Sequence, residues 1–191
     1  MVIVDRQIKY ALKEWAIAVD ALSKGEMLIL LRKGGIRERE FQVKHSQVWL
    51  YPTYEHQKPE LLKPEYAGRV TTVESGWHPN TVKIESCAKI TDVLPVSSFK
   101  QVAALQPYHI WNERMIDDRL NWKPQKPLLV LLMQVYRFVE PQTITYHPSY
   151  GGCKSWIELE RGISSESLVP VVKEVEYSDR TQAIKASICV E

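Results

Sequence analysis

The spacing of apolar residues near the start of the chain predicts a helix followed by a strand. Within residues 6–22, five apolar side chains recur at intervals of four and three positions, which is the period of one helix face. They are Ile8, Leu12, Trp15, Val19 and Leu22. We therefore expect an amphipathic helix that ends at Gly25, where glycine accepts a left-handed backbone, and then a buried strand over 26–32.

The remaining hydrophobic pattern predicts mainly strands. The strongest candidate is the long apolar run 127–138, although its leucine-rich part also fits a helix. Residues 40–51 alternate between apolar and polar only if a bulge or turn lies near His45. Further strands are expected at 69–75, 81–94, 142–146 and 154–159 and twice within 167–190, helices at 98–105 and 108–121, and an ordered loop at 52–68.

These strands and helices do not alternate regularly, which favours an α+β fold with a mainly antiparallel sheet. We expect about three helices, including the N-terminal amphipathic helix, and a barrel-like closure of the sheet is one form that this fold can take. Residues 1–191 are expected to form a single globular domain, in which 160–191 is either an edge hairpin or a C-terminal extension.

Composition narrows the class of protein without naming a function. Hydrophobic residues make up 45% of the chain and charged residues 25%, as in ordinary soluble proteins, and the net charge of +2 is far from that of a strongly basic nucleic-acid binder. Three widely spaced cysteines predict no disulfide framework, and the longest apolar runs are too short to cross a bilayer. We expect a cytoplasmic protein with no signal peptide and no membrane insertion.

The stretch "LRKGGIRERE" places two glycines between basic residues. It lacks the patterns GxxxxGK[ST] and GxGxxG, and the residues that follow do not predict a helix, so a nucleotide-binding loop is disfavoured. Two interpretations stay open: a solvated charged turn, and a basic rim that contacts nucleic-acid phosphates. The rim would consist of Arg32, Lys33, Arg37, Arg39 and Lys44.

The stretch "HSQVWLYPTYEHQ" concentrates histidines and aromatic residues. His45, Glu55 and His56 include types that ligate metals, but their spacing matches no standard zinc motif, so no metal site is predicted. Next to lysines, the rings of Tyr51 and Tyr54 can stack on bases. Simple packing of the aromatic residues is the competing interpretation.

Two further groups have weaker chemical signals. Glu113, Asp117 and Asp118 share the predicted helix 108–121, where carboxylates can bind Mg²⁺ or form salt bridges. Cys153 follows two glycines and precedes a lysine, but no pattern such as GxSxG marks it as a nucleophile. Salt bridges and packing are the expected roles of these residues.

Five stretches carry a family resemblance: residues 11–22, 29–38, 41–57, 122–138 and 151–159. With the combination of "LRKGGI" and "LYPTYEHQ", the chain resembles a bacterial, mainly cyanobacterial, family of uncharacterised conserved domains of unknown function. The resemblance implies an association with restriction-type endonuclease domains in some members, and it implies no reaction and no catalytic residues. It favours a role connected with nucleic acid.

Together these observations predict a non-catalytic nucleic-acid-associated binding module with no cofactor. The predicted binding residues are Arg32, Lys33, Arg37, Arg39, Lys44, His45, Tyr51, Tyr54 and His56. One alternative is a metal-dependent hydrolase or nuclease-like enzyme with its site between residues 45–57 and the Asp117–Asp118 helix. Another is a scaffold that binds a protein partner through exposed aromatic residues.

Overall fold

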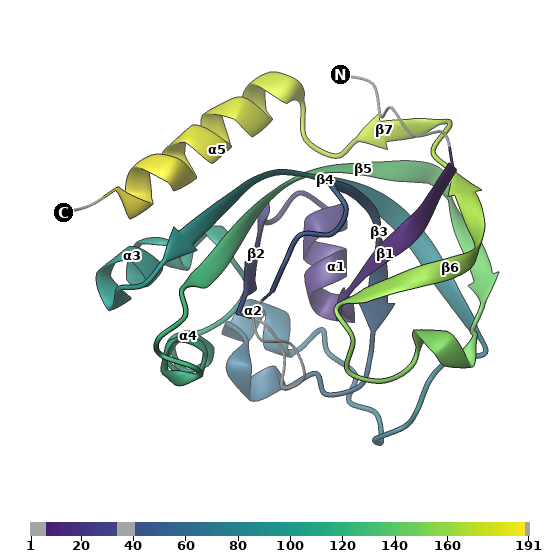
Figure 1. Cartoon of the computed structure of the whole chain (residues 1–191), viewed down its shortest axis with the longest axis horizontal. Helices are drawn as coiled ribbons and strands as arrows, with labels where there is room; N and C mark the ends of the chain where they lie inside the picture. Colours follow the sequence, from purple (N-terminus) through teal and green to yellow (C-terminus); the bar gives the residue numbers. More distant parts are fainter. Residues whose placement is uncertain (1–6, 34–40, 190–191) are drawn as a thin grey trace.

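The computed structural model describes residues 7–33 and 41–189, and in these residues it contains seven strands and five α-helices (Figure 1). The strands are β1 (Gln7–Trp15), β2 (Ile29–Arg32), β3 (Gln47–Thr53), β4 (Thr81–Val96), β5 (Leu128–Thr145), β6 (Trp156–Ser164) and β7 (Leu168–Pro170). The helices are α1 (Ala16–Ser23), α2 (Pro64–Ala67), α3 (Phe99–Ala104), α4 (Glu113–Asn121) and α5 (Glu174–Ile188). Single 3₁₀ turns lie at Pro59–Leu61, Gln106–Tyr108 and Pro148–Tyr150.

The strands form one sheet in the order β2-β5-β4-β3-β1-β6, and the short β7 pairs with β5. Every pairing is antiparallel except that of β1 with β3, so the predicted α+β class with a mainly antiparallel sheet is confirmed. The sheet is not closed into a barrel, so the barrel-like alternative is wrong: the path ends at β2 and β6. Figure 1 shows the long strands β4 and β5 crossing the molecule below α5.

The predicted N-terminal helix over residues 6–22 is wrong in its first half, which forms strand β1, and right in its second half, which forms α1. The register of β1 against β6 shifts between Ile8 and Tyr10, as at a β-bulge. Because of this irregularity, Ile8 and Ala11 contribute to one core cluster and Leu12 to the other. Ile8 and Leu12, which the helix prediction placed on one face, therefore lie in different core clusters.

Two other expectations also differ from the structure. Residues 69–75 pair with no strand in the described chain. The second strand expected in 167–190 is instead part of α5, whose buried residues Tyr177, Thr181, Ile184 and Ile188 follow the helical period. The helical period was missed because the first turns of α5 are rich in polar residues. The hydroxyl of Tyr177 on this helix lies 2.7 Å from the Thr91 hydroxyl on β4.

Several predicted elements are confirmed. Strand β5 contains the apolar run 127–138, and β4 covers 81–94. Helix α3 begins after Ser98, which forms a capping box with Gln101. Gly25 has φ +72, and a Cβ atom there would lie 2.8 Å from a methyl group of Val172, so both conformation and space favour glycine.

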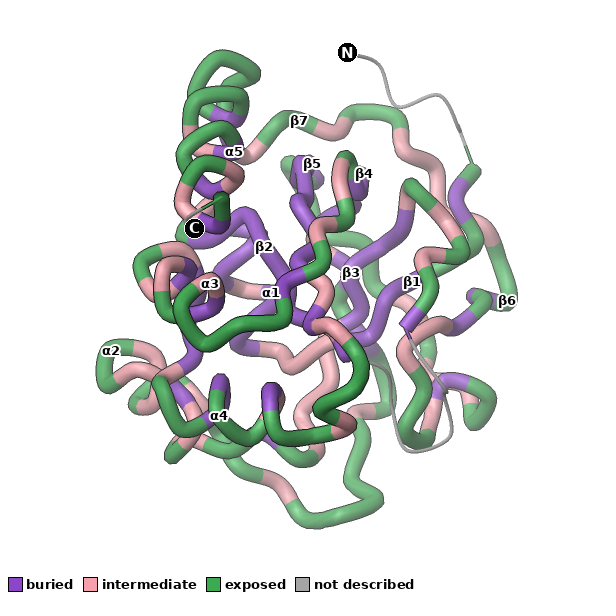
Figure 2. The backbone as a smooth tube through the Cα atoms, turned by 60° about the vertical axis from the view of Figure 1, so that its left-hand side comes forward, coloured by how far each residue is buried: buried purple, intermediate pink, exposed green. Residues whose placement is uncertain are grey.

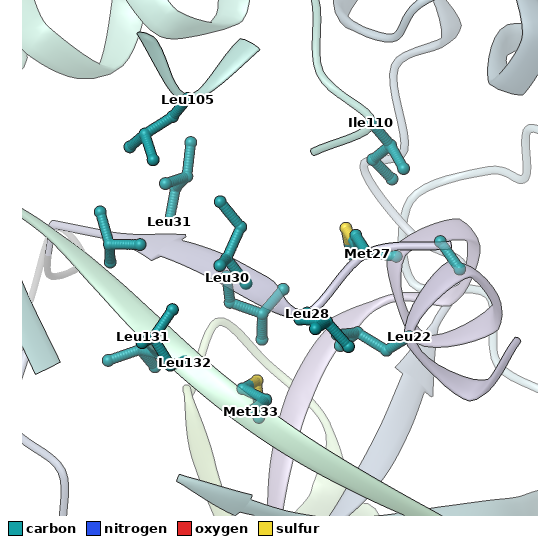
Figure 3. Packing of buried hydrophobic residues seen from close by; sticks show 14 of the residues in the cluster. Leu22, Met27, Leu28, Leu30, Leu31, Leu105, Ile110, Leu131, Leu132 and Met133 are labelled. Carbon is teal, nitrogen blue, oxygen red and sulfur yellow. The ribbon is translucent and has the colours of Figure 1, made fainter. Parts of the chain in front are cut away.

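Two hydrophobic clusters bury both faces of the central strands. The larger one joins α1, β2 and part of β5 to the C-terminal helix. Figure 3 shows part of it, where Leu30 and Leu31 of β2 lie near Leu131 and Leu132 of β5. The smaller one includes Trp49 and Tyr51 of β3, whereas Val48 and Leu50 of the same strand belong to the larger cluster. Figure 2 shows the result, with buried strands at the centre and exposed helices and loops around them. Both faces of β3 are therefore buried from Val48 to Tyr51.

Candidate functional site

A cleft of about 530 Å³ opens where the ends of three strands meet one helix and two loops. We call it the basic cleft. Its walls come from the end of β1, the end of β2, the exit of β3, the loop at 75–76, helix α4 and the loop at 152–155. Its lining residues are Lys13, Glu14, Trp15, Arg32, Lys33, Phe41, Thr53, Glu55, His56, Ser75, Gly76, Arg119, Gly152, Cys153, Lys154 and Ser155.

Positive charge dominates this cleft. Five of the lining side chains are lysines or arginines, two are glutamates and one is a histidine, although the whole chain carries a net charge of only +2. A concave surface with one predominant sign of charge concentrates the field and attracts ligands of the opposite sign. The basic cleft is therefore suited to an anion.

Arg32 has an unmet hydrogen-bonding capacity inside the cleft. Its Nη2 donates to the backbone oxygen of Lys13 at 2.6 Å and lies 3.2 Å from a carboxylate oxygen of Glu14. Its guanidinium carbon lies 5.5 Å from the centre of the Phe41 ring, which helps to hold the group in place. The Nε atom is buried and has no partner among the described residues. A buried donor without an acceptor is costly to stability.

Two lysines of the cleft are held by backbone oxygens. Lys13 donates through Nζ to Tyr150 O at 2.5 Å and Gly152 O at 2.8 Å, and Lys33 donates to Leu120 O at 2.8 Å. Burial lowers the pKa of both ammonium groups below the ordinary value for lysine. These lysines fasten the loop at 150–152 and the end of α4 to the strands, and they add positive potential without being free to move.

Three other groups of the cleft are available to a ligand. Arg119 projects from α4, burial lowers the pKa of its guanidinium, and within the described residues that group has neither a hydrogen bond nor an ion pair. Lys154 is exposed and donates to Ser149 O at 3.0 Å. His56 is exposed and adopts the left-handed region, with φ 61. These three side chains can contact an anion without breaking the contacts that support the cleft.

The predicted basic rim and the histidine of the following stretch are only partly brought together. Arg32, Lys33 and His56 meet in the basic cleft. Arg37 and Arg39 lie outside the described residues. Of the predicted rim, Arg32 and Lys33 thus lie at the end of β2, and their placement tests no role for them.

Lys44 and His45 lie elsewhere and do not line the cleft. Lys44 is exposed, and the His45 ring stacks on Tyr10 with 3.5 Å between ring centres and meets the Trp156 ring edge-on. Burial, followed by the charge of Lys44, lowers the pKa of His45. The ring of His45 is therefore occupied by packing within the protein.

The two tyrosines that were predicted to stack on bases also lie away from the cleft. Tyr51 is only 4% exposed and packs edge-on against Tyr150, and burial raises its pKa. Tyr54 lines a second hollow of about 260 Å³, beside α1. We call this second feature the α1 hollow; it is lined by Ala16, Ile17, Val19, Asp20, Pro52, Tyr54, Gln57, Arg69, Thr71, Lys83 and Glu85.

The enzyme alternative placed a site between residues 45–57 and the helix that carries Asp117 and Asp118. The basic cleft does lie between His56 and helix α4, but Asp117 and Asp118 are exposed on that helix and do not line it. Cys153 lines the cleft and is exposed. Within residues 7–33 and 41–189, no three histidine, cysteine or acidic side chains are grouped as a metal site would require. In the same residues, no helix has the length and apolar character needed to span a bilayer.

Sequence reasoning missed three cationic members of the cleft. Lys13 lies in the predicted helix 6–22, Arg119 lies in the predicted helix 108–121, and Lys154 directly follows Cys153, and none of the three was predicted to bind a ligand. They come together because β1, α4 and the loop before β6 converge at one end of the sheet. Local sequence contains no signal for this convergence. The pairing of Leu12 in β1 with Trp156 in β6 brings residues 13–15 close to residues 153–155, and this pairing is visible only in the structure.

The comparisons with known proteins identify a family. Among solved structures, the ASCH protein of Zymomonas mobilis is similar at 12% sequence identity and a TM-score of 0.46, over 95% of this chain and 96% of that chain. A point mutant of the same protein gives 10% identity and a TM-score of 0.45, over 95% and 99%. No curated protein matches. Residues 11–183 match the model described as "Domain of unknown function (DUF1802)", and the chain therefore belongs to this family.

Proposed function

We propose that this protein is a non-catalytic nucleic-acid-binding module and that the basic cleft receives phosphates of the nucleic-acid backbone. The observation that carries the proposal is the excess of positive charge in the cleft, where five lysines and arginines face two glutamates. Arginine forms directional hydrogen bonds to phosphate oxygens, and phosphate contacts supply most of the affinity of nucleic-acid-binding proteins.

The contacts of each side chain suggest how the work is divided. Arg119, Lys154 and His56 would contact phosphate oxygens, because they are accessible and are not needed to support the walls. Lys13 and Lys33 would contribute charge from fixed positions, because backbone oxygens already hold them. The cleft volume of about 530 Å³ is within the range of sites that hold a small ligand, so we expect it to accept one or two nucleotides of a longer strand.

Fluorescence anisotropy with a labelled ten-nucleotide strand tests the proposal. We expect binding at low salt that weakens steeply as salt rises, because each phosphate contact releases counterions. Arg119→Ala should weaken binding by about tenfold, the effect of losing one charge-assisted hydrogen bond. Arg114→Ala is the matched control, since Arg114 is an exposed arginine on the same helix that does not line the cleft.

Two results would overturn the proposal. One is the absence of binding at low salt to both DNA and RNA strands. The other is an equal loss of affinity in the Arg119→Ala and Arg114→Ala variants, because the interaction would then depend on the general charge of α4 and not on the cleft.

A further inference from the structure

A solvent-exposed tryptophan lies beside the basic cleft. Trp77 is 45% exposed, among the highest values for large apolar side chains in the described residues. It directly follows Ser75 and Gly76, both of which line the cleft, and it belongs to the segment between α2 and β4 along the lower edge of Figure 1. Adjacent residues are about 3.8 Å apart along the backbone, so the Cα atom of Trp77 lies next to the wall of the cleft. Its ring contacts that of Tyr54, which lines the α1 hollow.

The backbone around Trp77 is fastened on both sides. The backbone N–H of Gly76, which has φ +86, donates to a carboxylate oxygen of Glu55 in the wall of the cleft. The ring of His78 stacks on Tyr146, with ring centres 3.6 Å apart and planes within 9° of each other. The backbone N–H of Tyr146 in turn donates to Asn80 O at 2.9 Å. The indole is therefore presented by an ordered segment, which lowers the entropy cost of binding a ring against it.

The indole ring is partly exposed, and its contact with Tyr54 is edge-on and not stacked. Its contact with Tyr54 is nearly perpendicular, with an interplanar angle of 86° and 5.8 Å between ring centres. A perpendicular neighbour covers at most one face of a ring. Burying a tryptophan is favourable, and an exposed indole that is braced from one side is typical of a stacking surface.

We infer that Trp77 stacks on an unpaired base next to a phosphate held in the basic cleft, and that the ligand class is therefore single-stranded nucleic acid. This inference rests on the proposed function of the cleft. Bases inside a duplex already stack on their neighbours, so exposing one to an external ring requires unstacking it at a cost of a few kcal/mol. A strand with unpaired bases does not carry this cost, and both DNA and RNA offer the same ring faces.

An abasic strand separates the contribution of the base from that of the phosphates. We would measure the affinity of the full chain for ten-nucleotide dT and U strands, for an abasic strand of equal length and charge, and for a duplex. The unmodified protein should bind the dT and U strands about 5- to 100-fold more tightly than the abasic strand, the range expected for one stacked base. The duplex should bind no better than the abasic strand.

Trp77→Ala should remove this preference and leave the affinity for the abasic strand unchanged. Trp77→Phe should restore part of the preference, because phenylalanine also has a ring face. Phe99→Ala is the control, since Phe99 is 58% exposed on α3 and does not line the cleft. Its preference for dT over the abasic strand should equal that of the unmodified protein.

The possible failures are distinguishable. If the protein binds the dT and abasic strands equally and Trp77→Ala changes neither affinity, the stacking role is overturned while the phosphate site remains. If duplex binds more tightly than single strands, the ligand class is overturned. If no strand binds at low salt, the proposed function fails together with the inference.

Discussion

The basic cleft and the α1 hollow are both lined by charged side chains, but their charges are arranged differently. In the α1 hollow, two positive and two negative residues balance, and Arg69 pairs with both Asp20 and Glu26. In the basic cleft, five positive residues face two glutamates, and the Nε of Arg32 has no acceptor among the residues that the structure describes. For binding an anion, the balance of charge in a hollow therefore matters more than the number of charged residues. The α1 hollow is balanced, whereas the basic cleft keeps an excess of positive charge.

The largest expected effect concerns the ion pair between Glu14 and Arg32 in the basic cleft. Glu14 and Arg32 have side chains that are 12% and 14% exposed. Glu14→Gln should lower the free energy of unfolding by about 3 kcal/mol, because it leaves a largely buried guanidinium without its counter-charge. The same change should raise the affinity for an oligonucleotide, because it removes a negative charge from the site.

Urea denaturation and anisotropy measure these two quantities for Glu14→Gln. The matched comparison is Asp20→Asn, which affects the more exposed pairs of the α1 hollow. If the two variants lowered the free energy of unfolding equally, the ion pair of the cleft would be no more important than the exposed pairs of the α1 hollow. A loss of oligonucleotide affinity in Glu14→Gln would also contradict the account.

The second prediction concerns His109, a histidine in the core, and compares it with Arg32 of the basic cleft. Both have buried nitrogen atoms without a hydrogen-bond partner among the described residues. His109 is 3% exposed, lines neither hollow and has no partner for either ring nitrogen among the described residues. Burial, with a smaller contribution from the charge of Lys63, lowers its pKa from 6.5 to about 4. Between these values the unfolded chain binds more protons, so the contribution of His109 to stability is full above pH 6.5 and is lost as pH falls toward 4.

This loss should amount to about 3 kcal/mol between pH 7 and pH 4, since each unit of pKa corresponds to about 1.4 kcal/mol. Urea denaturation at both pH values measures it, and His109→Leu should show a correspondingly smaller loss. His78→Leu is the control, because His78 is exposed. If His109→Leu and the unmodified protein lose the same stability on acidification, the sealed histidine is not the cause.

The smallest effect is expected in the α1 hollow. Arg69 is about one-third exposed and also lies over the ring of Tyr66, 5.1 Å from its centre. Arg69→Ala should lower the free energy of unfolding by about 1 kcal/mol, because partly exposed ion pairs contribute little. It should leave oligonucleotide affinity unchanged. A loss of affinity comparable to that of Arg119→Ala would mean that the two hollows bind the ligand together.

The fold could be predicted from sequence where a segment carries one clear local signal, such as a continuous apolar run or a helix cap. The apolar run of β5 and the capping box of α3 are local signals, and both are confirmed. The register shift after Ile8 is not visible in sequence, because it depends on how β1 pairs with β6. The interval of four between Ile8 and Leu12 fits a helix face, but the structure places the two residues in different core clusters of a strand, so the prediction was wrong in this segment.

The candidate site could be predicted only in part for a related reason. Arg32, Lys33 and His56 were chosen from two neighbouring stretches, and the end of the sheet brings them together. Lys13, Arg119 and Lys154 come from three distant segments, so only tertiary structure associates them with the cleft. Tyr51 was chosen for its ring, but both faces of β3 are buried, which local sequence does not reveal.

The central claim is that the unneutralised charge of the basic cleft binds phosphates, and the salt dependence of binding tests it most directly. We would compare the slope of log K against log salt concentration for the unmodified protein, for Arg119→Ala with Lys154→Ala, and for Arg69→Ala with Lys83→Ala in the α1 hollow. The account predicts that the cleft pair reduces the slope by about 2, about one for each lost phosphate contact, and that the hollow pair leaves it unchanged. Equal slopes for the cleft pair and the unmodified protein would contradict it.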